Sequence, residues 1–230
     1  MCRACLADPE PLPAGYRCAR CGADFDSPHP LDSSGVCLAC RTNLRPFDAV
    51  HAFTAYDGRV RELVHLHKYG RILPLHAALA RWLLAGLPSD AQADVVVPVP
   101  IDLWKRYQRG FNQAQWLARA AAARLGAPLV QALRRKFDWN RAAQASRSAR
   151  ERRRAVRGLF RVARPAAVAG RRVLLVDDVF TTGSTAAACA AALKRAGAVR
   201  VEVAVVARVP RRIWESQYRP APVAQGESAG

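Results

Sequence analysis

Short apolar runs and longer helix-forming stretches alternate along this chain. The segments 94–100 (DVVVPVP), 173–176 (VLLV) and 199–209 (VRVEVAVVARV) are almost wholly apolar, as expected of parallel strands covered on both faces. Before and between them lie stretches such as ILPLHAALARWLLAG and AAACAAALKRAG, whose composition favours helices. The alternation predicts an α/β fold with a mostly parallel sheet flanked by helices.

The same pattern divides the chain into three parts. Residues 1–46 are rich in Cys, Gly and Pro and show little periodicity, whereas residues 47–209 carry the strands and helices. Residues 210–230 have the composition of a disordered tail. Within the second part, residues 134–160 are Arg-rich and have no hydrophobic stripe. We expect this basic arm to be a mobile loop beside the functional site.

The positive charge of the chain is concentrated around the basic arm. The formal net charge is +18, and the segment from Arg134 to Arg172 holds fourteen Lys and Arg against two acids. Such a segment indicates an anionic partner, which could be a pyrophosphate, a nucleic acid or both, or else a solvated basic surface. Trp104, Trp116 and Trp139 could stack on bases, although we expect the first two to pack in the core.

Six cysteines near the N-terminus form three CxxC pairs, which are typical of zinc sites. The pairs are Cys2/Cys5, Cys18/Cys21 and Cys37/Cys40. Two such turns supply the four thiolates of a tetrahedral site, and an all-Cys set leaves no open position for catalysis. We favour Cys18, Cys21, Cys37 and Cys40 as ligands of a structural zinc ion. The alternative set is Cys2, Cys5, Cys18 and Cys21.

The segment 173–185 (VLLVDDVFTTGST) is the strongest candidate for chemistry. Asp177 and Asp178 stand at the carboxyl end of a predicted strand, where open α/β sheets bind ligands. A loop of small residues follows and leads into a helix, which is an arrangement that binds phosphate. The loop residues are Thr181, Thr182, Gly183, Ser184 and Thr185. No Lys follows Gly183, so the loop is not a Walker A motif.

The two acids before this loop indicate a phosphorylated sugar. Neighbouring carboxylates can accept hydrogen bonds from the two vicinal hydroxyls of a ribose while the loop binds its phosphate. The alternative is a polar turn between a strand and a helix without a ligand. A second anion site is predicted where the segment 94–100 ends, because Arg106, Arg109, Gly110, Asn112 and Gln113 open the next helix.

Segment 173–185 resembles the phosphoribosyl pyrophosphate (PRPP) motif of type I phosphoribosyltransferases. Together with other segments it makes the chain similar to the ComF family of competence-associated proteins, which join a Cys-rich zinc module to a phosphoribosyltransferase-like domain. The matching segments are the CxxC pairs, FDAVHAFTAYDG, LHKYG, VVVPVP, RYQRGFNQAQ, Gln144, RGLF and VLLVDDVFTTGST.

The resemblance implies a role for each candidate residue. Asp177 and Asp178 would contact the ribose hydroxyls, with Mg²⁺ bridging ribose and pyrophosphate, and residues 181–185 would bind the 5-phosphate. Lys68 and the segment with Pro100, Arg106 and Arg109 would face the pyrophosphate. The implied reaction displaces pyrophosphate from the ribose C1 atom, and it needs positioned charge more than a strong base.

Two functions are therefore expected from this sequence. The first is a Mg²⁺-dependent phosphoribosyltransferase of unknown acceptor, which the resemblance places in DNA uptake with other competence proteins as partners. The second is a non-catalytic adaptor that binds single-stranded DNA through the basic arm and the zinc module. The polar opening MCRAC does not resemble a signal peptide, and we found no membrane-spanning stretch. We therefore expect a cytoplasmic protein.

Overall fold

The computed structural model describes most of the chain. The described residues are 9–13, 15–42, 45–70, 72, 74–102, 104, 107–108, 110–136, 158–211 and 213.

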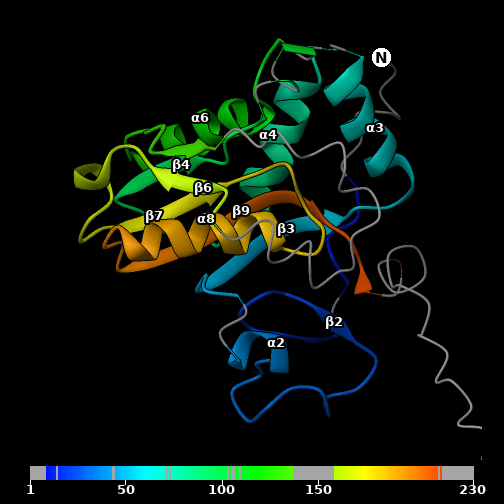
Figure 1. The fold of residues 1–230 in the computed structure, drawn as a ribbon. Coiled ribbons are helices and arrows are strands. Elements are labelled where there is room, and N and C mark those ends of the chain that lie inside the picture. The colour runs from blue at the N-terminus through cyan, green and yellow to red at the C-terminus, as the bar shows by residue number, and fades with distance from the viewer. Residues whose placement is uncertain are drawn as a thin grey trace, which may run out of the picture.

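A five-stranded sheet, parallel throughout, forms the centre of the fold (Figure 1). Its strands follow the order β3 (Ala49–Ala55), β9 (Arg200–Arg208), β7 (Arg172–Val176) and β4 (Val95–Pro98), and β8 (Val179–Phe180) also pairs with β9. The pairings β3–β9, β9–β7, β7–β4 and β8–β9 are all parallel. The predicted α/β fold with a mostly parallel sheet is confirmed.

The apolar runs arise because both faces of the sheet are covered. In β7, Val173 and Leu175 pack into one core cluster, and Leu174 and Val176 pack into another on the opposite face. Each of these four side chains is 3% exposed or less. Successive side chains of a strand point to opposite faces, so a strand buried on both sides needs an apolar residue at every position.

Helices cover the two faces unequally (Figure 1). Helix α8 (Ser184–Arg195) packs on one face, while α3 (Gly58–Tyr69), α4 (Leu75–Ala85) and α6 (Gln113–Leu125) pack on the other. Among the described residues, every helix is too short or too polar to cross a membrane.

Two short strands lie where the sequence predicted only loop. Strands β5 (Leu133–Arg135) and β6 (Phe160–Val162) pair as an antiparallel ribbon, so the loop predicted for residues 134–160 is wrong at both ends. Leu133 and Phe160 are buried in the core cluster that holds α8. A three-residue strand with one buried side chain is too short to show periodicity. Residues 137–157 of the arm lie outside the described residues.

A third short strand, β8, directly follows the two acids. Phe180 in β8 is 3% exposed and pairs in register with Arg208 at the end of β9. The small-residue loop therefore begins at Thr181, because Val179 and Phe180 first rejoin the sheet.

The Cys-rich segment lies below the end of β3 in Figure 1. It comprises the hairpin of β1 (Tyr16–Arg17) and β2 (Asp24–Phe25) together with the short helix α2 (Leu38–Arg41). Its buried cysteines belong to the same core cluster as α8. Residues 9–13, which precede this segment in the chain, run alongside β3. The Thr54 hydroxyl donates to the carbonyl of Glu10 at 2.7 Å, and Leu12 N–H donates to the carbonyl of Phe53 at 2.8 Å.

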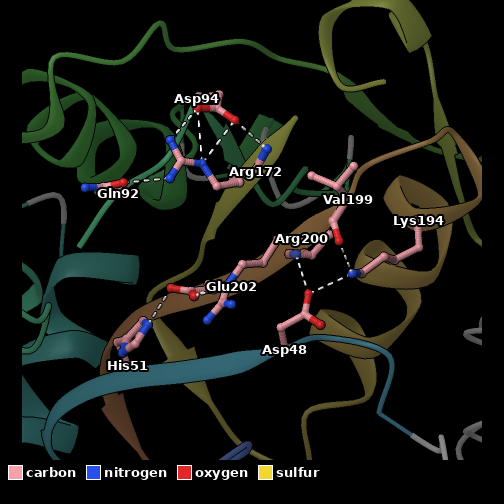
Figure 2. Close-up of polar contacts among 10 residues, drawn as sticks. Asp48, His51, Gln92, Asp94, Arg172, Lys194, Val199, Arg200 and Glu202 are labelled. Carbon is pink, nitrogen blue, oxygen red and sulfur yellow. Dashed lines mark hydrogen bonds and ion pairs between the residues drawn. The ribbon is translucent and has the colours of Figure 1, made fainter. Parts of the chain in front are cut away.

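Polar contacts join the strands at the amino edge of the sheet (Figure 2). Arg172, at the start of β7, donates to Asp94 just before β4, with Nη2 and Oδ1 2.7 Å apart. Asp48, before β3, pairs with Lys194 of α8 at 2.8 Å and accepts from the N–H of Val201 in β9. Each contact joins neighbouring elements at one end, so together they favour the observed register.

The Asp94–Arg172 pair predicts an acid-dependent loss of stability. Hydrogen bonds from Arg172 lower the pKa of Asp94 from 3.8 to about 2. A carboxyl group whose pKa is lower in the folded state than in the unfolded state stabilises the fold at pH values above its unfolded-state pKa. This stabilisation is lost as the pH falls through the folded-state pKa. Asp94→Asn should therefore unfold at lower urea concentration than the wild type at pH 7, with the difference shrinking between pH 4 and pH 2. The exposed Asp90→Asn is the matched control, and an equal effect of both variants would contradict the assignment.

Candidate functional site

The two acids of segment 173–185 are held at the carboxyl edge of the sheet by strand β9. Asp177 N–H donates to the carbonyl of Ala204 at 3.0 Å, and Val206 N–H donates to the carbonyl of Asp178 at 3.0 Å. Asp178 N–H in turn donates to Oδ1 of Asp177 at 2.9 Å. The backbone of both acids is therefore anchored while their carboxylates face the same edge.

Asp178 is paired with Lys68, which stands in the last turn of α3. The Lys68 Nζ atom lies 2.8 Å from Oδ2 of Asp178, and both side chains are mostly buried. Burial lowers the pKa of Lys68, but attraction to Asp178, and then to Asp177, raises it further, so its pKa lies above the usual value. Lys68 is therefore a charged lysine beside the acid pair.

These residues line a pocket of about 170 Å³. Of the residues predicted from the sequence, the structure brings together around it Lys68, Pro100, Asn112, Gln113, Asp177 and Asp178. The walls come from the carboxyl ends of β4 and β7, the end of α3, the start of α6 and β5. Segments far apart in the chain therefore meet at one concave site.

The start of α6 supplies a polar wall of this pocket. The Asn112 side chain caps the helix by accepting from Ala114 N–H at 3.2 Å, and it donates to the carbonyl of Val99 at 3.1 Å. Gln113 is 3% exposed, and its Nε2 atom has no hydrogen-bond partner among the described residues. A buried amide donor that lines a pocket can donate to a ligand.

Asp102 and Arg135 also line the pocket, and sequence reasoning assigned them no role. Their closest charged atoms, Nε of Arg135 and Oδ2 of Asp102, are 3.7 Å apart. Asp102 could have been suspected from its place four residues after Pro98. Nothing in the sequence shows that Arg135, thirty-three positions further along, reaches the same pocket.

The small-residue loop connects β8 to α8 through a left-handed glycine. Gly183 has φ +75°, and a Cβ atom built on it would lie 2.4 Å from the Phe180 ring. Only glycine fits this position, both for its backbone conformation and for the space available. The loop is therefore held tightly against Phe180.

The N–H groups of this loop point to its use as a phosphate site. Among the described residues, the N–H groups of Thr181, Thr182 and Gly183 donate to no carbonyl, and that of Ser184 donates to the Thr182 hydroxyl at 3.2 Å. The exposed side chains of Thr181, Thr182 and Thr185 stand around them. Donors at the start of a twelve-residue helix favour an anion.

A second cavity of about 310 Å³ adjoins the pocket and shares Pro100, Asp102 and Arg135 with it. Three exposed cations on the β5–β6 ribbon and next to it line the cavity, namely Arg134, Lys136 and Arg161. None of the three forms an ion pair with a described carboxylate. The cavity therefore carries uncompensated positive charge.

Four buried cysteines form the second candidate site. The Sγ atoms of Cys18, Cys21, Cys37 and Cys40 all lie within 4.8 Å of one another. The N–H groups of Cys21 and Cys37 donate to the Cys18 sulfur at 3.4 and 3.3 Å. Such a set could hold a tetrahedral metal such as zinc, and backbone donors to sulfur suit a thiolate ligand.

The hydrogen bonds among the cysteines favour a thiolate at Cys18. Hydrogen bonds from Cys21 and then Cys40 lower the pKa of Cys18, whereas the hydrogen bond with Cys18 raises the pKa of Cys21 and of Cys40. Burial lowers the pKa of Arg45, but attraction to Cys21, Cys40 and Cys37 outweighs burial and raises it. A cation therefore accompanies the sulfur cluster in the protein interior.

Some predicted residues lie outside the described residues, and one expectation is wrong. Arg106 and Arg109, together with the alternative zinc ligands Cys2 and Cys5, are not described. Trp104 and Trp116 do not pack in the core, because they are 64% and 44% exposed. Trp104 stacks on the exposed Tyr107 with ring centroids 6.0 Å apart, and Trp116 stacks on His76 at 4.8 Å.

Comparison with known proteins matches this chain to relatives over most of its length. Residues 112–223 match the model of the phosphoribosyl transferase domain. The chain is 34% identical over 195 residues to DNA utilization protein YhgH of Salmonella typhi, a match that covers 81% of each chain. It is 25% identical over 198 residues to Competence protein F of Haemophilus influenzae, covering 83% of this chain and 84% of that protein. The chain belongs to the ComF family.

Two further matches concern only part of this ComF-family chain. Adenine phosphoribosyltransferase of Pelodictyon phaeoclathratiforme is 43% identical over 58 residues, which are 23% of this chain and 33% of that protein. A solved structure titled as the allosteric regulatory enzyme of purine biosynthesis is 27% identical and covers 55% of this chain and 24% of that one, with a TM-score of 0.39.

The close contact of Gly183 with Phe180 predicts an unusually costly substitution. Gly183→Ala and Gly126→Ala both place a side chain at positive φ, at +75° and +62°, but a Cβ on Gly126 meets nothing within 4 Å. The backbone strain of each should cost about 1–2 kcal/mol, and the Phe180 clash should add about 1–3 kcal/mol at Gly183 only. Urea unfolding of both variants measures the difference, and equal losses of stability would show that the Phe180 contact is unimportant.

Proposed function

We propose that this protein binds PRPP with Mg²⁺ and is a phosphoribosyltransferase of the ComF family. The observation that carries the proposal is the acid pair Asp177–Asp178 at the wall of a pocket, directly before a loop in which the N–H groups of Thr181, Thr182 and Gly183 donate to no described carbonyl. The carboxylates suit the vicinal ribose hydroxyls, and the loop Thr181–Thr185 suits the 5-phosphate.

The opposite wall of the pocket suits the pyrophosphate. Lys68 supplies a cation beside Asp178, and the start of α6 supplies the buried Nε2 donor of Gln113. Pro100 lies in the same wall, and Arg106 and Arg109 follow it in the sequence. A ligand with phosphate at one end and pyrophosphate at the other therefore meets donors at both ends.

The acidic residues of the pocket suit Mg²⁺. Asp177, Asp178 and Asp102 supply carboxylate oxygens, which are the protein ligands that Mg²⁺ prefers when it also binds phosphates. Bound there, the ion would neutralise negative charge on the leaving pyrophosphate. The residues of the chain position the sugar and shield the reacting carbon, so no strong general base is required.

Calorimetry with PRPP and Mg²⁺ tests the binding proposal. The wild type should bind, and Asp177→Asn/Asp178→Asn should weaken binding by about 10-fold or more, because each charge-assisted hydrogen bond contributes about 1.5–3 kcal/mol. Asp94→Asn at the other edge of the sheet is the matched control and should bind like the wild type. Equal binding by the acid-pair variant would reject the site. Pyrophosphate release with a panel of bases then tests turnover.

We further propose that Cys18, Cys21, Cys37 and Cys40 hold a structural zinc ion. Four buried sulfurs within 4.8 Å support this proposal, because a closed all-Cys set favours zinc and leaves no position for substrate. The ion would connect the two turns of a segment that has two short strands and a four-residue helix to stabilise it.

A second function, binding of single-stranded DNA, is favoured by a separate observation. The cavity beside the pocket carries Arg134, Lys136 and Arg161 without carboxylate partners among the described residues, and Trp104 and Tyr107 expose a stacked aromatic pair. Cations that follow a backbone and aromatic faces that stack on bases suit single-stranded nucleic acid. Relatives are named for DNA utilization and competence, so we place this binding in DNA uptake, with other competence proteins as partners.

The salt dependence of binding to a single-stranded oligonucleotide tests this second function. Changing Arg134, Lys136 and Arg161 to Gln should weaken binding and make the slope of log K against log salt shallower by about 2, because each phosphate that a cation neutralises on a single strand accounts for about 0.7 of the slope. A variant with Arg61, Arg124 and Arg195 changed to Gln removes the same charge from other exposed positions. An equal change in slope for both variants would assign the binding to net charge alone.

A further inference from the structure

Arg208 is a buried arginine at the junction of the Cys-rich segment and the sheet. It is the last residue of β9 and is 5% exposed, with Ala55 of β3 and Phe180 of β8 as its register neighbours. Among the described residues it forms no ion pair with a carboxylate, and its Nε atom has no partner. A buried guanidinium of this kind is costly unless other contacts stabilise it.

Arg208 contacts two different parts of the structure. Its Nη1 atom donates to the carbonyl of Cys21 at 2.6 Å, inside the predicted metal site. The guanidinium carbon lies 5.7 Å from the centroid of the Phe180 ring, beside the phosphate loop. One side chain therefore contacts both the backbone of Cys21 and the Phe180 ring next to the loop.

The charge of Arg208 also matches a tetrathiolate metal site. Four thiolates around a divalent ion carry a net charge of −2. Arg208 donates to the Cys21 carbonyl, and although burial lowers the pKa of Arg45, attraction to Cys21, Cys40 and Cys37 outweighs burial and raises it. The buried Arg208 and the half-buried Arg45 would balance the site when the metal is bound, and the two cations would repel each other more strongly without it.

Phe180 connects Arg208 to the loop Thr181–Thr185 through packing contacts. Phe180 is 3% exposed and packs edge-on against Phe47 at 5.8 Å. Its ring lies so close to Gly183 that a Cβ there would meet it at 2.4 Å. Gly183 precedes α8 and forms part of the loop whose N–H groups face the proposed phosphate. A shift of the Phe180 ring therefore requires a shift of the loop.

We propose that Arg208 is a positioning residue that links metal binding at Cys18, Cys21, Cys37 and Cys40 to sugar-phosphate binding at the loop Thr181–Thr185. The proposal rests on the proposed function, because it assigns the sugar phosphate to this loop. Linkage of this kind is reciprocal: the metal strengthens binding of the sugar phosphate, and the sugar phosphate strengthens binding of the metal by the same factor.

The test measures the zinc affinity of the full-length protein by competition with a chelator, with and without saturating ribose 5-phosphate. In the wild type, ribose 5-phosphate should tighten zinc binding by about 5-fold or more. Arg208→Met should reduce this factor to near one, and Arg208→Lys should restore part of it. Arg45→Met is the matched control: it should weaken zinc binding but keep the factor, because Arg45 acts on the sulfurs. An unchanged factor in Arg208→Met would overturn the proposal.

A second measurement separates failure of this proposal from failure of the proposed function. Amide hydrogen exchange needs no sugar phosphate, and zinc removal should speed exchange in residues 180–187 while residues 113–125 of α6 stay protected. If ribose 5-phosphate binds no form of the protein but this local change occurs, the sugar-phosphate assignment fails and the connection through Arg208 stands. If exchange in residues 180–187 is unaffected by zinc removal, the connection itself is wrong. Phe180→Leu, which keeps an apolar side chain, replaces Arg208→Met if that variant does not fold.

Discussion

Hydrogen bonds along the carboxyl half of β9 hold the two acids and the start of the following loop in place. Ala204 and Val206 of β9 bond the backbone of the two acids, and Val209 N–H donates to the carbonyl of Phe180 at 2.9 Å. The chain from Asp177 to Phe180 is thereby fixed for four residues beyond β7. Without this pairing the acids would lie on a flexible turn, and the loop Thr181–Thr185 would have no fixed starting point.

This arrangement separates the ion pairs that join the strands from the ion pair beside the pocket. The ion pairs of Asp94 and Asp48 lie at the amino edge of the sheet, whereas the Lys68–Asp178 pair lies at the carboxyl edge. The amino-edge pairs join neighbouring elements and can tolerate solvent. The carboxyl-edge pair is buried beside a pocket, where each charge acts more strongly on a bound ligand because less water screens it.

The Cys-rich segment packs into the same core as the central sheet. Its cysteines share a core cluster with Phe47 and Phe180, and Arg208 at the end of the central strand bonds its backbone. The segment therefore packs against the same side chain that determines the position of Gly183. A small segment can affect a distant part of the chain only through such a contact, because a flexible tether would transmit nothing.

The sequence alone determined the apolar strands β4, β7 and β9, the acid pair, the glycine turn and the spacing of the four cysteines, because each depends on neighbours within a few residues. A run such as VLLV, or a Gly at a tight turn, is a local requirement and can be recognised locally. Only the tertiary structure decided that Lys68 pairs with Asp178, that Arg135 reaches the pocket and that Arg208 joins the cysteines to Phe180. These contacts join residues far apart in the chain, and they arise from the strand order and register of the parallel sheet, which no local pattern specifies.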